Sequence, residues 1–278
     1  MDERVTLALP RPGPGLKALL LVVGALGILE AIAYSYIPGG RSFFLALACS
    51  TDDVLNGQIW RPFTAGLLTR PDALGHLLFT LVMLYFLSPD LERRWGTWRF
   101  LRFVGAAMVF GFVLSMGIDA AIPGGTRALH PPIMYGAGAA IAAIAIAWSK
   151  LNAQAQVRLF FFIPVSGKQF FWVTIGFCLL GIVYPDGVPE GMLSPFGGVL
   201  VGILLGGTPS LLRQAYLRIK LGLLRRRVGA PAIPLSPPST KGKSNPPRRG
   251  APLLRVVQGG ADDELRKRRP PKDKRYLN

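Results

Sequence analysis

The sequence contains very little histidine or cysteine. Among 278 residues there are two histidines, His76 and His130, and two cysteines, Cys49 and Cys178. Two cysteines make neither a disulfide framework nor a metal-ligand cluster. Two histidines leave few side chains for acid–base catalysis or metal binding. The sequence therefore predicts no metal site and no cofactor, and it predicts that both cysteines serve as small apolar residues.

Acidic residues are also scarce, with 15 Asp and Glu against 32 Lys and Arg, and the net charge is +17. Most of that charge lies in residues 213–278, where 18 Lys and Arg stand against 4 Asp and Glu. We expect this segment to be a basic cytoplasmic tail, mostly disordered, that binds anionic lipid and not nucleic acid. Its first part, residues 214–227, is expected to continue as a basic amphipathic helix on the membrane surface.

Upstream of this tail the chain is strongly apolar. Half of all residues are hydrophobic and the mean hydropathy is +0.38, values that indicate a multi-span membrane protein. We expect an all-α domain of six transmembrane helices over residues 15–212, preceded by a cytoplasmic segment, residues 1–14. The expected spans are residues 15–37, 74–87, 100–118, 131–149, 170–183 and 193–212.

The first span raises two questions of its own. Its length favours a spanning helix over a signal-peptide core, with cleavage after Ala31-Ile32-Ala33 as the alternative. It also contains Glu30, and an ionisable group inside a span is a candidate functional residue by default. For Glu30 we favour a position at the outer interface, where water reaches the carboxylate.

The distribution of Lys and Arg predicts the orientation of the spans, because basic residues favour the cytoplasmic side. With the N-terminus inside, the inner segments hold 28 of the 32 basic residues. The outer loops hold the other four, Arg41, Arg61, Arg70 and Arg127. Both termini are therefore expected to be cytoplasmic, in a membrane of the bacterial plasma-membrane type.

Residues 131–149 are uncharged and rich in glycine and alanine, which predicts a helix surrounded by other helices. Small residues four apart form one close-packing face, and they are Ala139, Ala143 and Ala147. The last span has the same spacing at Gly198, Gly202 and Gly206. We expect these two faces to pack against each other at the centre of the bundle, although ordinary helix packing alone would account for the pattern.

At this point the chain resembles the rhomboid family of intramembrane serine proteases and their inactive relatives, over roughly residues 15–212. Several features carry the resemblance: Trp60-Arg61 in a large outer loop, His76 at the start of the second span, LERRWGTWRFL at residues 91–101, and the glycine-rich fourth and sixth spans. The outer loop, residues 38–71, suits the membrane interface, with Trp60 and Arg61 at the headgroups. In the inner turn we expect Glu92 to pair with Arg93, Arg94 or Arg99.

The resemblance implies a catalytic dyad that this sequence does not contain. Active rhomboids are expected to carry Gly-x-Ser-Gly at the start of span four, but here Tyr135-Gly136-Ala137-Gly138 stands in its place. The histidine expected from span six aligns with Pro195, so Ala137 is expected to face a proline. On span two His76 matches a residue that helps to bind the oxyanion, whereas the expected asparagine is Thr80. A hydroxyl needs a neighbouring base to act as a nucleophile, and at the aligned positions both the hydroxyl and the base are missing.

We therefore predict a pseudoprotease that binds transmembrane helices of client proteins, with a vestigial site at His76, Thr80, Tyr135, Gly136 and Gly138. A polar interior near the outer side of spans two and four would hold polar or helix-breaking parts of the client. One alternative is an active intramembrane serine endopeptidase whose dyad is displaced to Ser194 and a histidine. A transporter or channel is a third possibility, disfavoured by the few ionisable residues in the spans and by the absence of a visible inverted repeat.

Overall fold

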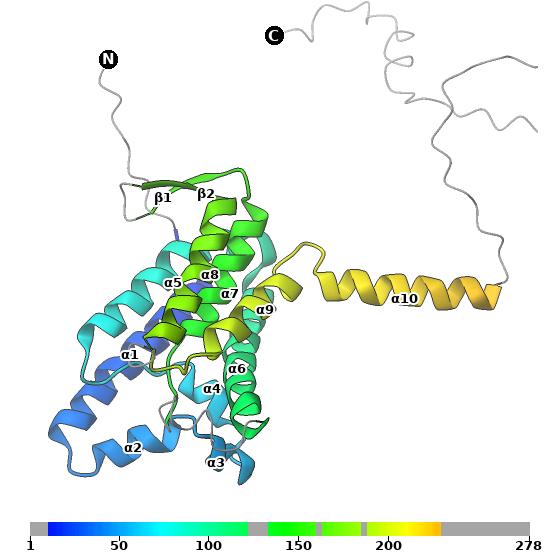
Figure 1. Ribbon diagram of the computed structural model, residues 1–278. Helices are drawn as coiled ribbons and strands as arrows, with labels where there is room; N and C mark the ends of the chain where they lie inside the picture. Colours follow the sequence, from blue (N-terminus) through cyan, green and yellow to red (C-terminus); the bar gives the residue numbers. More distant parts are fainter. Residues whose placement is uncertain (1–10, 122–132, 160–162, 185–187, 229–278) are drawn as a thin grey trace, which may run out of the picture. The chain divides into compact units, whose positions relative to one another are not determined.

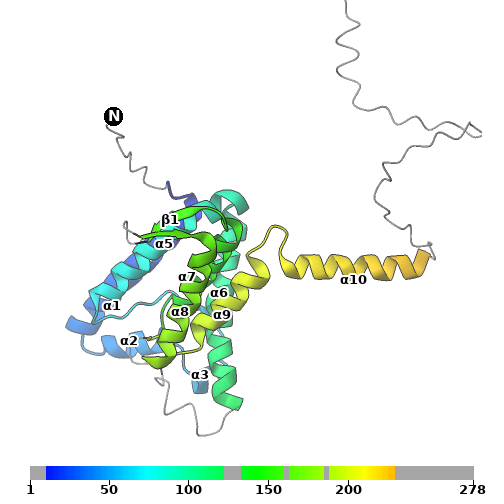
Figure 2. The same ribbon diagram turned by 45° about the horizontal axis from the view of Figure 1, so that its top comes forward.

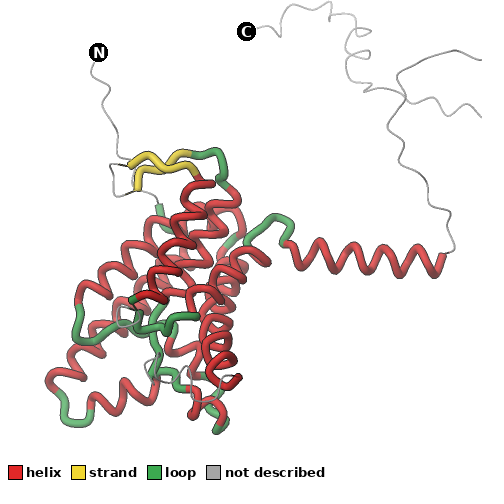
Figure 3. The backbone as a smooth tube through the Cα atoms, in the orientation of Figure 1, coloured by secondary structure: helices red, strands yellow, loops and turns green. Residues whose placement is uncertain are grey.

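The computed structural model describes residues 11–121, 133–159, 163–184 and 188–228. Its helices are α1 (Pro14–Tyr36), α2 (Gly40–Leu47), α3 (Thr51–Leu55), α4 (Arg61–Ala65), α5 (Leu74–Trp95), α6 (Thr97–Ala121), α7 (Gly138–Leu151), α8 (Gly167–Val183), α9 (Ser194–Leu205) and α10 (Leu211–Val228) (Figure 1). One antiparallel hairpin joins α7 to α8 and consists of β1 (Gln156–Leu159) and β2 (Ile163–Ser166) (Figure 3). We call the end of the bundle with this hairpin the hairpin end, and the opposite end, with α2–α4, the loop end.

The apolar helices fall into two groups by length. Helices α1, α5 and α6 are long and apolar enough to cross a membrane. Helices α7, α8 and α9 are shorter apolar helices. All of the expected spans therefore contain a helix in the described part of the chain, and α1 lies within one residue of the expected bounds at each end.

In two of the expected spans the helix is shorter than expected at one end, whereas α5 continues eight residues beyond its expected end, to Trp95. The span expected over residues 131–149 becomes helical only at Gly138, because the residues just before it use their backbone groups in contacts with distant loops. Residues 131 and 132 lie outside the described residues. The last span ends at Leu205 and not at residue 212. A turn that contains Pro209, which has no N–H for helix bonding, separates it from α10.

Helix α7 is the centre of the bundle. Its buried residues are Ala139, Ala140, Ala142, Ala143, Ile144, Ala145, Ile146, Ala147 and Ser149. It packs against α5, α6, α8 and α9, and the two ribbon views agree that these helices surround it (Figures 1 and 2). Alanine allows this because a side chain of one carbon keeps neighbouring backbones close.

Glycines make the contact between α7 and α9 very close. A Cβ atom at Gly198 would overlap the carbonyl group of Ala139, and one at Gly202 would come within 2.8 Å of the Ala143 carbonyl oxygen. On the other side of α9, a Cβ at Gly197 would lie 2.6 Å from the Cα of Gly111 in α6. Helix α9 is therefore held between α7 and α6 with no room for additional atoms.

Glu92 fixes the N-terminus of α1 at the hairpin end. Its carboxylate accepts hydrogen bonds from the backbone N–H groups of Gly15 (2.8 Å) and Leu16 (3.1 Å), and from the Thr97 hydroxyl (2.9 Å). The expected pairing of Glu92 with a neighbouring arginine is therefore wrong. The first four backbone N–H groups of a helix have no partner within the helix, and a buried carboxylate can accept hydrogen bonds from them. Glu92 gains more from these bonds than from a pair with an exposed arginine.

The helix expected over residues 214–227 is present as α10, but its side chains do not divide into one polar and one apolar face. At 100° per residue, Arg213 and Lys220 lie on one side, whereas Arg218 lies on nearly the opposite side. Apolar residues occupy both intervening sides, including the exposed Ile219 and Leu221. The basic amphipathic pattern expected for this helix is thus not present. The disordered tail predicted beyond it, residues 229–278, lies outside the described residues.

Candidate functional site

The turn before α7 is held in place by three other parts of the chain. Met134 exchanges two backbone hydrogen bonds with Cys49, the Tyr135 N–H donates to the Pro189 carbonyl (3.0 Å), and the Gly136 N–H donates to the Ala65 carbonyl (2.9 Å). Gly136 has a φ of +125°, a backbone conformation that side-chain-bearing residues rarely adopt. The start of α7 is therefore fixed by tertiary contacts at the loop end.

Glu190, from the segment between α8 and α9, lies over this turn. Its side chain is only 10% exposed, and its Oε1 accepts a hydrogen bond from the Gly138 N–H at 3.1 Å. Cβ atoms at Gly136 and Gly138 would come within 2.6 and 2.7 Å of Glu190. Both glycines therefore leave the space that the carboxylate fills, and the partial positive charge of the helix start stabilises it.

His76, near the start of α5, faces the same carboxylate. Its Nδ1 accepts a hydrogen bond from the Arg70 backbone N–H at 3.2 Å, so in the neutral imidazole Nε2 carries the proton. Nε2 lies 3.6 Å from Glu190 Oε1, a charge contact but longer than a hydrogen bond. The expected vestigial residues His76 and Gly138 are thus brought together around Glu190.

These residues line the polar end of a groove of about 390 Å³ between α5, α7 and α8. Helix α5 contributes His76, Phe79, Thr80, Met83 and Leu87, and α7 contributes Gly138, Ile141, Ala142 and Ala145. Helix α8 contributes Phe170, Val173, Thr174, Phe177, Cys178 and Gly181. The remaining lining residues are Val188 and Glu190, from the segment before α9, and Pro195 in α9. The lining is mostly apolar, as in sites that hold hydrophobic ligands. Thr80 is 1% exposed within it.

The positions aligned with the dyad lie in different surroundings. Pro195 lines the groove, whereas Ala137 is 1% exposed, belongs to the main core cluster, and is not among the lining residues. That Ala137 faces Pro195 stays a prediction. Tyr135, the remaining vestigial residue, packs edge-on against Phe44, and burial raises the pKa of its phenol. A phenol held in the neutral form is a poor nucleophile.

Ser194, the alternative nucleophile, is completely buried, and its Oγ has no hydrogen-bond partner among the described residues. A Cβ at Gly111 would lie 2.8 Å from that Oγ, so the hydroxyl faces α6 and not the groove. His76 makes its contacts with Arg70 and Glu190 instead. A Ser194–His76 dyad is therefore not formed in this structure. His130 lies outside the described residues.

We expected Glu30 at the outer interface in contact with water, but the structure buries it. It is 1% exposed, Oε2 accepts the Thr69 N–H at 3.5 Å, and Oε1 has no partner among the described residues. It does not line the groove. A buried carboxylate with one weak hydrogen bond is unusual inside a span. Among the described residues, however, Glu30 belongs to no group of His, Cys, Asp and Glu side chains that could hold a metal ion.

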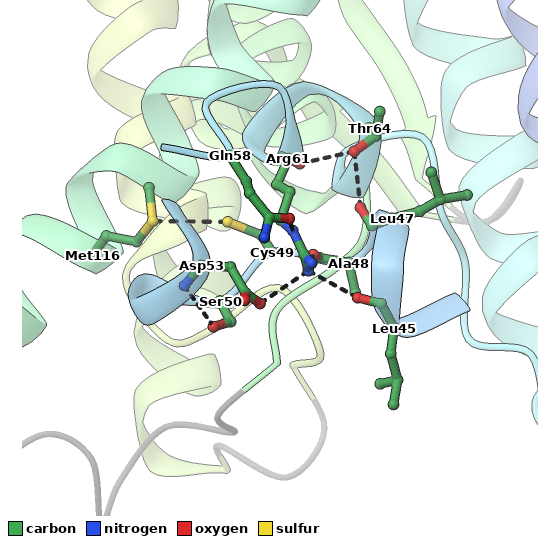
Figure 4. Close-up of polar contacts among 10 residues, drawn as sticks. All are labelled: Leu45, Leu47, Ala48, Cys49, Ser50, Asp53, Gln58, Arg61, Thr64 and Met116. Carbon is green, nitrogen blue, oxygen red and sulfur yellow. Dashed lines mark hydrogen bonds and ion pairs between the residues drawn. The ribbon is translucent and has the colours of Figure 1, made fainter. Parts of the chain in front are cut away.

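Arg61 holds the outer loop together (Figure 4). Its guanidinium donates to the carbonyl groups of Leu45 and Ala48, both at 2.8 Å, and to Gln58 Oε1 at 2.6 Å, and it pairs with Asp53 at 3.0 Å. The side chain is 9% exposed, so the expected placement of Arg61 at the headgroups is wrong. Trp60, which is 55% exposed, remains available for that surface.

We predict that Arg61→Lys loosens this loop, since one ammonium cannot reach acceptors arranged around a planar fork. Two buried carbonyl groups would lose their donor, at about 1–3 kcal/mol each. Hydrogen–deuterium exchange of residues 45–64 should rise by about tenfold or more. The matched control is Arg70→Lys, because Arg70 is 44% exposed and pairs only with its neighbour Asp72. Equal exchange in the two variants would contradict the role given to Arg61.

Sequence reasoning missed Glu190 altogether. The one signal available was a single acidic residue in a short connection before a glycine-rich span. No local pattern links it to Gly138, which is 52 residues away. The groove was expected as a polar interior near spans two and four; its lining is instead mostly apolar, and the structure adds α8 as its third wall.

Comparison with known proteins gives two matches. The model of the family described as Rhomboid domain matches residues 56–210, which is more than half of the chain. The Na(+)/H(+) antiporter NhaA 1 of Brucella anthropi is 26% identical over 212 residues, covering 76% of this chain and 50% of the antiporter. The chain thus spans about half the length of that curated relative. The family model covers the α5–α9 helices and the Glu190 site in one continuous match.

Proposed function

The chain belongs to the rhomboid family, and from this premise we propose that it is a pseudoprotease that binds transmembrane helices of client proteins. The observation that carries the proposal is at the start of α7. The nucleophile position is Ala137, and the neighbouring Gly138 N–H already donates to the Glu190 carboxylate. Acyl transfer develops a negative charge that needs free donors, and a resident anion would repel it.

The groove supports binding in place of catalysis. It is lined mainly by apolar side chains of α5, α7 and α8, and it lies where a helix in the membrane would approach from the side. Its two ionisable lining residues, His76 and Glu190, lie at the loop end, which suits a client with a polar or helix-breaking segment near that membrane surface. We accordingly propose lateral entry between α5 and α8.

The same proposal includes the arrangement in the membrane. Helices α1, α5, α6, α7, α8 and α9 would be the six spans, with both termini cytoplasmic and the hairpin end inside, in a membrane of the bacterial plasma-membrane type. The distribution of basic residues supports this orientation. The basic segment that begins with α10 would then contact anionic lipid on the inner surface.

We predict that the purified protein in detergent or liposomes does not cleave model rhomboid substrates, whereas an active rhomboid protease in the same assay does. The double variant Ala137→Ser with Pro195→His is also expected to remain inactive, because Glu190 still occupies the anion position. Gel and mass-spectrometric detection of products is the measurement. Serine-dependent cleavage by the unmodified chain would refute the pseudoprotease.

A phosphonate probe that labels activated serines tests the alternative enzyme directly. No labelling is expected, since the hydroxyl of Ser194 is buried and has no hydrogen-bond partner among the described residues. Labelling that disappears in Ser194→Ala would establish the displaced dyad and replace the proposal made here. An active rhomboid protease serves as the positive control for the probe.

A further inference from the structure

We infer that Glu190 selects the client: the groove takes a transmembrane helix that carries Lys or Arg near the outer membrane boundary. This inference rests on the proposed function and specifies its ligand. It starts from the charge of the groove, which has one carboxylate at its loop end and no Lys or Arg among its lining residues.

The charge of Glu190 is only partly compensated. Oε1 takes both contacts that the structure gives the carboxylate, the Gly138 N–H and the imidazole of His76. No described group donates to Oε2. The His76 Nδ1 accepts a hydrogen bond from the Arg70 backbone N–H, so it is Nε2 that faces the carboxylate. The carboxyl group of Glu190, nine-tenths buried beside an apolar groove, thus has one oxygen with no donor among the described residues.

A basic side chain of a client is the complementary group. Lys and Arg place their methylene chains along apolar surface while the charged end reaches a polar partner, which matches a groove that is apolar along its length and acidic at one end. A charge-assisted hydrogen bond to a carboxylate is about twice as strong as a neutral one, and it is screened little in a buried site. A client without a basic residue would gain only the apolar contact.

The experiment uses the full chain in detergent micelles and two synthetic transmembrane peptides. Each peptide is a Leu/Ala helix of about 22 residues, with Arg in one and Gln in the other at the same position near the outer end. Binding of the labelled peptides is measured by fluorescence. The Arg peptide is expected to bind about tenfold more tightly than the Gln peptide, and Glu190→Gln is expected to abolish this preference.

Glu190→Gln keeps an oxygen acceptor for the Gly138 N–H, so the turn should remain folded, as thermal unfolding of the variant will show. Asp72→Asn is the matched control, because Asp72 is an exposed acid that pairs with Arg70 outside the groove lining. It should preserve the preference for Arg.

The outcomes separate this inference from the function on which it rests. Equal binding of both peptides to the unmodified chain, or a preference for Arg that survives Glu190→Gln, overturns the inference and leaves client binding standing. If neither peptide binds, both the inference and the proposed client binding are overturned. Loss of the preference when phosphatidylethanolamine is added at the level of the peptide would assign the carboxylate to a lipid ammonium group instead.

Discussion

Gly198→Ala is expected to destabilise the protein by about 3 kcal/mol or more, although alanine is the better helix former by about 1 kcal/mol. The added methyl group would overlap the carbonyl group and Cα of Ala139. These are backbone atoms of α7, which is enclosed by four other helices and cannot move aside. The helices α7 and α9 would have to separate, and the contact at the centre of the bundle would be lost.

The measurement is the free energy of unfolding of the micelle-solubilised protein in an SDS titration. The matched control is Gly176→Ala in α8, where a Cβ atom would meet nothing within 4 Å. That variant should be as stable as the unmodified chain or slightly more stable, because only helix propensity changes. Similar losses in both variants would mean that the close approach of α7 and α9 is not what Gly198 provides.

Glu92→Ala is expected to lower the free energy of unfolding by about 3–5 kcal/mol. The substitution removes the acceptor for two backbone N–H groups and one hydroxyl, and unsatisfied buried donors cost about 1–3 kcal/mol each. The first turn of α1 should fray and detach from the end of α5. Glu92→Gln, which keeps one oxygen acceptor but loses the charge, should show an intermediate loss.

Asp90→Asn provides the comparison, since Asp90 lies in the same turn of α5 but is 32% exposed, and its contacts are a pair with Arg94 and a hydrogen bond from the Asn152 amide. Pairs of that kind contribute about 0–1 kcal/mol. Thermal unfolding monitored by circular dichroism, together with hydrogen exchange of residues 14–19, measures the effect. An Asp90 variant that loses as much stability as the Glu92 variant would show that charge in general, and not the cap on α1, is responsible.

The family and the helical character of the membrane domain could be predicted from the sequence, and the family match confirms the resemblance. Apolar run length located a helix within every expected span, because burial in a membrane is a property of consecutive residues. That Ala137 and Pro195 leave the dyad empty stays a prediction, although their lack of a hydroxyl or a base could be read directly. The boundary of α7 could not, because residues 134–136 hydrogen-bond to Cys49, Ala65 and Pro189.

The polar contacts show the limit most clearly. Glu92 was expected to pair with an arginine beside it in the chain, but it bonds to Gly15, 77 residues away. Arg61 was expected at the headgroups, and the fold instead buries it among the carbonyl groups of its own loop. In both positions the charged side chain forms stronger hydrogen bonds with otherwise unpaired backbone groups than it would form with water. Only the folded chain brings the side chain and those groups together.

By itself, then, the sequence determined the family, which segments are apolar, and which helix is built from small residues. Tertiary structure alone decided that Glu190 fills the space over Gly136 and Gly138 and that α5, α7 and α8 enclose one groove. The physical reason is the distance along the chain over which each kind of interaction acts. Hydropathy and small-residue spacing act between neighbours along a helix, whereas the partner of a buried carboxylate is set by how distant segments pack.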